Sequence, residues 1–192
     1  MDNSESHALN RLRAGDARPF AALMQTHADR LVRAAFMLCG EEALARDLAQ
    51  ETFCRALAQA GKFRGDSRLY TWLYGIMRRL CLQHLRRYRR RAQILENYPP
   101  PPGENPGPEE VWMAGQRQGG LRQAVRFLPA AQREIIRLRF VEEMKLAEIA
   151  LALDIPQGTV KSRLHHALAA LRGGSRNPEP PGKKKTEKSH GL

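Results

Sequence analysis

The chain of 192 residues is poor in aromatic residues, in cysteine and in uninterrupted hydrophobic runs. Aromatic residues make up only 6% of it, against 42% for all hydrophobic residues, so a core would consist mostly of Leu, Ala, Ile and Val. The hydrophobic runs are broken by arginine well short of the roughly 20 residues that a membrane span needs. The polar, acidic stretch from Met1 to Ala8 shows no secretory pattern. We therefore expect a cytoplasmic protein with no membrane insertion.

Cysteine occurs three times, at Cys39, Cys54 and Cys81, so the thiols cannot all pair within the chain. Each lies in an apolar, helix-like stretch, and we expect three buried free thiols in a reducing compartment. Cys81 and His84 stand one helical turn apart, but two candidate ligands are weak evidence for a metal site. We expect neither a metal nor a cofactor.

Strand signals are scarce, because Val, Ile, Thr and aromatic residues hardly ever alternate between tight turns. Apolar residues recur instead at helical spacing in both halves of the chain. The spacing predicts three helices in the first half, over residues 19–40, 41–60 and 68–91, and three in the second half, over residues 128–143, 146–153 and 158–172. The predicted fold class is all-α, with two small helical domains.

Proline is concentrated between the halves, in the segment "NYPPPPGENPGPEE" from Asn97 to Glu110. Proline fixes φ and lacks a backbone donor, so neither helix nor sheet can continue there, and four consecutive prolines favour a stiff polyproline spacer. Residues 96–110 also contain four acids and no base. The predicted organisation is a first domain over residues 1–95, an acidic Pro-rich flexible linker over 96–111, a second domain over 112–173 and a disordered basic tail over 174–192.

Positive charge is in excess, with 32 Lys and Arg against 20 Asp and Glu and a formal net charge of +12. Such an excess favours a polyanionic partner, either nucleic acid or an anionic membrane. Between Arg78 and Arg91 the chain has seven arginines and no acid, and these repel one another unless phosphates neutralise them. A membrane-surface protein is less favoured, since no helix sets a large apolar face opposite its arginines. A basic protein that binds no polyanion is the remaining alternative.

The last two predicted helices are joined by the turn "DIPQG" and the second is basic, which is the layout of a helix-turn-helix. Ile149 and Leu153 fall on the inner side of the first helix, where Ala150 is small enough for close approach. Val160 and Leu164 fall on the inner side of the second. The open side can then contact phosphates and base edges through Gln157, Thr159, Lys161, Ser162, Arg163, His165 and His166. The alternative is a helical hairpin with a solvated basic face.

Two motifs of the first half could bind a partner. In "DLAQETF", the side chains of Asp47, Gln50 and Glu51 share one helix face, which could dock a protein or merely be solvated. The loop "KFRGDSR" could hold an unstacked base, with nearby aromatic rings as stacking platforms. Alternatively, Asp66 or Ser67 of this loop only caps the next helix, and Trp72 belongs to the core.

Taken together and in order, "DLAQETF", "KFRGDSRLYTWLYGIMRRL" and "LPAAQREIIRLRFVEEMKLAEIALALDIPQGTVKSRL" resemble the extracytoplasmic-function sigma factors of bacterial RNA polymerase. The resemblance covers about Phe20 to Arg172, without the linker. It implies a sigma-2-like helical bundle, a sigma-4-like helix-turn-helix domain and a promoter-specificity factor that is not an enzyme. Such a factor binds core RNA polymerase, recognises the −35 and −10 promoter elements and promotes DNA melting. The implied partners are the β′ clamp and β flap of the polymerase, promoter DNA and an anti-sigma factor.

The resemblance also implies roles for individual residues. The contact with core polymerase falls on Asp47, Leu48, Gln50 and Glu51. The contact with the −10 element, including a loop that takes a flipped base, falls on Phe63, Arg64, Asp66, Ser67, Arg68, Arg78 and Arg79. The contact with the −35 element falls on Thr159, Lys161, Ser162, Arg163, His165 and His166. The linker of the family runs toward the RNA exit path, which the acidic residues here would suit.

Two departures from the family pattern bear on these roles. Lys145 stands where Ser or Thr often precedes the helix at 146–153, so the start of that helix is expected to be less well capped. The pair His165 and His166 stands where relatives more often have an aromatic residue and Arg, which leaves the −35 sequence open and could make binding pH-sensitive.

Two other functions stay open on the residues. A conventional helix-turn-helix regulator, whose first half dimerises or senses a ligand, would bind palindromic duplex DNA without polymerase. A sigma-like protein that titrates a partner and never initiates transcription would tolerate loss of the recognition-helix charges. The basic residues Lys161 and Arg163 favour DNA binding over the second of these.

Overall fold

A computed structural model of the chain describes residues 11, 16, 18–94 and 119–174. Helices are the only regular secondary structure among these residues, which confirms the predicted all-α class. The predicted linker, and the predicted tail apart from residue 174, lie outside the described residues.

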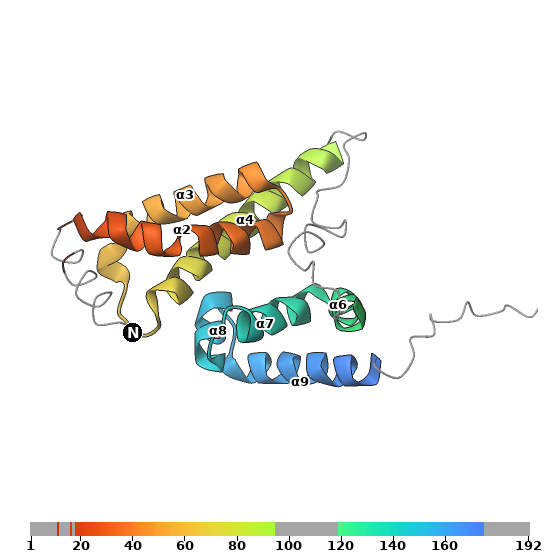
Figure 1. The fold of residues 1–192 in the computed structure, drawn as a ribbon. Coiled ribbons are helices and arrows are strands. Elements are labelled where there is room, and N and C mark those ends of the chain that lie inside the picture. The colour runs from red at the N-terminus through yellow and green to blue at the C-terminus, as the bar shows by residue number, and fades with distance from the viewer. Residues whose placement is uncertain (1–10, 12–15, 17, 95–118, 175–192) are drawn as a thin grey trace, which may run out of the picture.

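The first half of the chain is a three-helix bundle (Figure 1). Its helices are α2 (Arg18–Cys39), α3 (Glu42–Ala58) and α4 (Leu69–Ile94), with a short 3₁₀ helix, η1 (Ala60–Lys62), after α3. Helix α2 ends where Gly40 takes a φ of 73° and donates its N–H to the Phe36 carbonyl. Glycine adopts this left-handed conformation without a Cβ penalty, so α3 can turn back and pack against α2.

The bundle core corrects one prediction about the cysteines. Cys39 and Cys81 are buried as predicted, but Cys54 is exposed. Cys54 follows Phe53, whose ring packs into the core, and successive residues of a helix point about 100° apart. One apolar stretch therefore has an inner and an outer side, and Cys54 lies on the outer one.

The second half consists of α6 (Gly119–Arg126), α7 (Ala130–Phe140), α8 (Leu146–Leu153) and α9 (Gln157–Gly174). The predicted helices at 128–143, 146–153 and 158–172 correspond to α7, α8 and α9. Helix α6 was not predicted, because it begins with two glycines, which are poor helix formers. It packs against α9.

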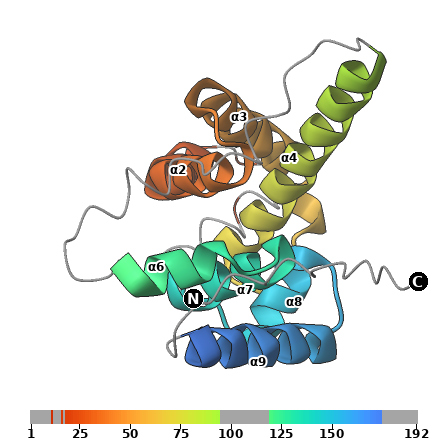
Figure 2. The same cartoon turned by 90° about the vertical axis from the view of Figure 1, so that its right-hand side faces the viewer.

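The two halves pack against each other, which the sequence left open. The second half lies against the N-terminal part of α4, and the C-terminal part of α4 extends beyond both groups of helices (Figures 1 and 2). Helix α4 meets α8 at Gly75, where an added Cβ would lie 3.5 Å from the carbonyl oxygen of Ala152. Buried residues of both halves form one continuous hydrophobic core.

Candidate nucleic-acid and polymerase interfaces

Helix α3 presents an exposed polar ridge, which we define as Asp47, Gln50 and Glu51. These residues share one face, as their spacing predicts. The Glu51 carboxylate pairs with Arg55 one turn later, at 2.7 Å. Leu48, which the resemblance assigns to the same contact, is buried in the bundle. The ridge is therefore a hydrophilic surface, and the buried side chain of Leu48 packs beneath it in the bundle.

The loop before α4 combines a buried ring with exposed polar side chains. Phe63 is 4% exposed, and its ring centroid lies 5.1 Å from that of the half-buried Trp72. Arg64 and Asp66 are exposed on either side of Gly65, which has a φ of 85°. Phe63 thus anchors the loop in the core, and Arg64 and Asp66 face outward.

The start of α4 does not show the hydroxyl cap that the sequence suggested at Ser67. The Ser67 hydroxyl donates to the carbonyl oxygen of Arg68, at 3.3 Å, instead of accepting a backbone N–H. The Ser67 side chain is half-buried.

The arginines predicted to bind the −10 element fall into two groups. Arg64 and Arg79 are exposed, and the Arg79 Nε–H donates to the Gly75 carbonyl. Arg68 and Arg78 instead form ion pairs with glutamates of the second half, at 2.6 and 2.8 Å. In the packed arrangement of the two halves, Arg68 and Arg78 of the predicted DNA-binding residues are therefore paired with glutamates.

The helix-turn-helix has the predicted internal packing. Ile149, Leu153 and Val160 are buried between its helices. Helix α8 ends at Leu153 and is followed by Asp154, whose left-handed conformation has a φ of 55°. The N–H groups of Thr159 and Val160 donate to the carbonyl of Pro156 and begin α9. These contacts set the orientation of α9 relative to α8.

The outer face of α9 carries the residues predicted to contact the −35 element. Lys161, Ser162, His165 and His166 are exposed, whereas Thr159 and Arg163 are half-buried. The rings of His165 and His166 lie edge to face, with centroids 5.7 Å apart. Helix α9 contains no acidic residue, so its face is neutral to positive throughout.

Helix α8 is capped by an acid, which corrects the expectation drawn from Lys145. The Lys145 N–H donates to Glu148 Oε2 at 2.8 Å, the carboxylate half of a capping box. Burial acts to raise the pKa of Glu148, but hydrogen bonds from Arg68 and from the Lys145 backbone outweigh it, so the pKa lies below its usual range. Glu148 therefore serves both the start of α8 and the contact with the first half.

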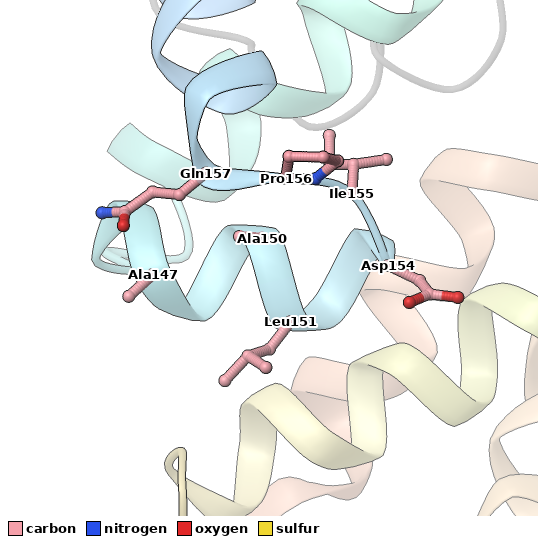
Figure 3. A pocket seen from close by; sticks show the side chains of 7 residues that line it. All are labelled: Ala147, Ala150, Leu151, Asp154, Ile155, Pro156 and Gln157. Carbon is pink, nitrogen blue, oxygen red and sulfur yellow. The ribbon is translucent and has the colours of Figure 1, made fainter.

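An open groove follows α8 and the turn into α9 (Figure 3). Its lining residues are Ala147, Ala150, Leu151, Asp154, Ile155, Pro156 and Gln157. Asp154 is the only ionisable side chain among them, and no nucleophile and base stand together, so the groove offers contacts for binding and no acid–base chemistry. Among the described residues, no three His, Cys, Asp or Glu side chains form a group that could hold a metal ion.

Sequence reasoning missed the residues that join the two halves. They include Arg30, whose Nε–H donates to Glu142 at 2.7 Å across 112 positions, and Glu134, which accepts from Arg78 and Tyr74. No local pattern marks them, because their partners are distant in sequence.

Comparison with known proteins assigns both halves. A family model described as Sigma-70 region 2 matches residues 23–91, and one described as Sigma-70, region 4 matches residues 124–173. The chain is 29% identical over 173 residues to the ECF RNA polymerase sigma factor SigW of Bacillus subtilis, covering 85% of this chain and 92% of that one. It is 35% identical over 161 residues to SigL of Mycobacterium tuberculosis, covering 83% of this chain and 90% of the relative.

The chain belongs to the extracytoplasmic-function family of sigma factors. It is therefore a promoter-specificity factor that binds core RNA polymerase and promoter DNA to initiate transcription, and it is not an enzyme. The region 2 match covers the polar ridge, the loop before α4 and most of α4 itself. The region 4 match contains α8, the turn and all but the last residue of α9.

Solved structures share the fold of this sigma factor. The sigma factor RpoE of Bartonella quintana, in complex with the anti-sigma factor NepR, superposes with a TM-score of 0.62 at 24% identity, over 82% of this chain and 96% of that one. CnrH, in complex with the cytosolic domain of CnrY, superposes with the same TM-score at 23% identity, over 89% and 96%. Within the residues that the structure describes, no helix is both long and apolar enough to cross a bilayer.

Proposed function

We propose that this sigma factor docks on the β′ clamp of core polymerase through the polar ridge of α3. The observation that carries this assignment is the exposure of all three ridge residues on a helix that packs mainly on α2 and α4. The ridge therefore stays accessible while the second half is packed against the first. Its two carboxylates and one amide offer acceptors to basic and polar groups of the polymerase.

The first domain then holds the −10 strand on the loop before α4 and on α4 itself. Arg64 and Arg79 face outward and can contact phosphates, while Asp66 can accept hydrogen bonds from an unstacked base. Phe63 acts through its buried ring, which fixes the loop. Ser67, Arg68 and Arg78 complete the proposed −10 set.

The second domain reads the −35 element with α9. Lys161 and Arg163 suit phosphate oxygens or guanine edges, and Thr159 and Ser162 suit either phosphate or base. His165 and His166 extend the same outer face. The exposed rings of Phe127 and Phe140 offer apolar contacts for the β flap.

Three broader parts of the proposal draw on the relatives. The domains extend over residues 1–95 and 112–173, and the two family matches fall within these bounds. The protein acts in the cytoplasm. An anti-sigma factor holds it inactive, as suggested by the complexes of RpoE with NepR and of CnrH with CnrY.

A competition assay for core polymerase tests the ridge. Asp47→Ala/Gln50→Ala should weaken binding by about tenfold or more, the scale of losing an interface hot spot. Gln25→Ala/Asp29→Ala, which changes the same residue types at exposed positions of α2, is the matched control and should bind as the unmodified chain does. Equal affinities for all three proteins would refute the assignment of the ridge.

A further inference from the structure

The ion pairs that join the two halves of the described chain all run in one direction. The arginine belongs to the first half and the carboxylate to the second. The N–O distances are 2.7, 2.6 and 2.8 Å, respectively, in the pairs Arg30–Glu142, Arg68–Glu148 and Arg78–Glu134. We call the three arginines the arginine face and the three glutamates the glutamate patch. The second half thus sets three glutamates against three arginines of the first half. Its Arg137 also lies at this contact and donates to the Tyr74 hydroxyl at 2.7 Å.

Two of these pairs are forked. Nε and Nη2 of Arg68 bind the two carboxylate oxygens of Glu148 at 2.6 and 2.9 Å. Nε and Nη2 of Arg78 bind those of Glu134 at 2.8 and 3.2 Å. The planar guanidinium uses the same fork for a phosphate group. The glutamate patch therefore occupies positions that nucleic-acid phosphates could take.

One face of α4 makes most of this contact. Thr71, Tyr74, Gly75 and Arg78 have the spacing i, i+3, i+4 and i+7, which places them on a single stripe. The hydroxyls of Thr71 and Tyr74 donate to Glu148 and Glu134, respectively, at 3.3 and 3.1 Å. Both views show the second half lying along this part of α4 (Figures 1 and 2). The stripe that carries Arg78 is thus the one that the second half covers.

Arg30 extends the arginine face from α4 onto α2. Its guanidinium carbon lies 3.8 Å from the ring centroid of Tyr70, and its Nη2 donates to the carbonyl of Glu142 at 2.7 Å. The Arg30 side chain is 35% exposed whereas that of Glu142 is 8% exposed. The arginine therefore stands at the edge of the contact on an aromatic support, a combination that also suits single-stranded nucleic acid.

We propose that the arginine face binds the phosphates of single-stranded promoter DNA, and that the glutamate patch covers this face until the two domains separate. The proposal rests on the proposed capture of the −10 strand by the first domain, and it adds Arg30 to the residues that hold the strand. In the closed chain, carboxylates engage these three guanidinium groups, and the strand has the other exposed basic side chains to bind. Separation of the domains frees three more guanidinium groups at once.

The salt dependence of oligonucleotide binding measures how many phosphates the chain contacts. For single strands, the slope of log affinity against log salt changes by about 0.7 per neutralised phosphate, so uncovering three arginines should steepen it by about 2. The probe is a fluorescein-labelled oligothymidylate, titrated with the full-length chain and followed by anisotropy. Glu134→Gln/Glu142→Gln removes two of the three ion pairs and should thereby open the contact, while the Glu148 cap of α8 stays intact.

A second route to the open chain changes no charge. At Gly75 a Cβ lies at an ordinary contact distance of 3.5 Å from the Ala152 carbonyl, so Gly75→Ala should stay closed. The branched side chain of Gly75→Leu has no room there and should separate α4 from α8. Gly75→Leu should therefore reproduce the steeper slope, and Gly75→Ala should bind as the unmodified chain does.

Controls separate uncovering from a change in net charge. Asp29→Asn/Glu41→Gln removes two exposed acids elsewhere and should leave the slope unchanged. In the open background, Arg30→Gln should reduce the slope by about 0.7, whereas Arg46→Gln on the exposed side of α3 should not. Equal slopes for the open and unmodified chains would overturn the proposal. An Arg30→Gln effect no larger than that of Arg46→Gln would do the same.

Transcription with core polymerase distinguishes this proposal from the function on which it rests. If the open variants bind the oligonucleotide no better but the unmodified chain still directs new transcript starts, only the covering of the arginine face is wrong. If neither the unmodified chain nor the open variants direct starts, the proposed function itself fails.

Discussion

Ile149→Ala should lower the free energy of unfolding of the helix-turn-helix far more than Leu151→Ala, although both residues lie on α8. Ile149 is fully buried, whereas Leu151 is 56% exposed. Removing a buried isoleucine side chain costs about 2–5 kcal/mol, because the transfer energy is lost and a cavity remains. Removing an exposed leucine side chain changes the free energy of unfolding by about 0.5 kcal/mol or less.

Urea denaturation followed by far-UV circular dichroism measures this difference. With a slope of about 1–3 kcal/mol per molar urea, Ile149→Ala should lower the midpoint of the second domain by about 1 M or more. Leu151→Ala should leave the midpoint nearly unchanged. Ile149→Ala should also lose −35-dependent transcription first as temperature rises, since the packing of α8 orients α9. Equal destabilisation by the two substitutions would refute the account of this domain.

Three further predictions concern the thiols, one glycine and one carboxylate. Burial raises the pKa of the Cys81 thiol to about 12, so iodoacetamide at neutral pH should label Cys54 in the folded chain and spare Cys81, as peptide mass spectrometry would show. Gly40→Ala should destabilise the chain by about 1–2 kcal/mol, because φ is 73° there, while Gly158→Ala, with nothing within 4 Å of the added Cβ, should not lower the thermal midpoint. The folded-state pKa of Glu148 is lowered. Its contribution to stability is therefore present above the unfolded-state pKa of about 4.3 and is lost as the pH falls through the lower folded-state pKa. The thermal midpoint of Glu148→Gln should fall less steeply on acidification than that of the unmodified chain, and an equally steep fall in the two proteins would contradict this.

Local pattern predicted much of the fold because helices depend on near neighbours in sequence. Residues 146–153 are α8 as predicted, since the apolar spacing that places Ile149 and Leu153 inward is visible within eight positions. Burial of Cys54 was predicted wrongly because an apolar stretch does not by itself reveal which side of a helix faces out. The short helix α6 was missed because it begins with two glycines, which are poor helix formers.

The contact between the two halves could not be predicted, because its partners are far apart in the chain. Arg78 and Glu134 stand 56 positions apart, and Arg30 and Glu142 stand 112 apart. A charged residue that will be paired across a domain contact looks, in sequence, like any solvated charge. The resemblance identifies Arg78 as a DNA contact. Its partner Glu134 becomes visible only in the folded structure, where the two halves pack together.

Run-off transcription with purified core polymerase tests the central claim most directly. The template is a pool of genomic fragments, and the transcript starts are sequenced. A sigma factor with these two domains should produce new starts that share −35 and −10 elements at a fixed spacing, and Lys161→Ala/Arg163→Ala should abolish the dependence on the −35 element. Core polymerase that neither binds the chain nor gains new starts would contradict the account.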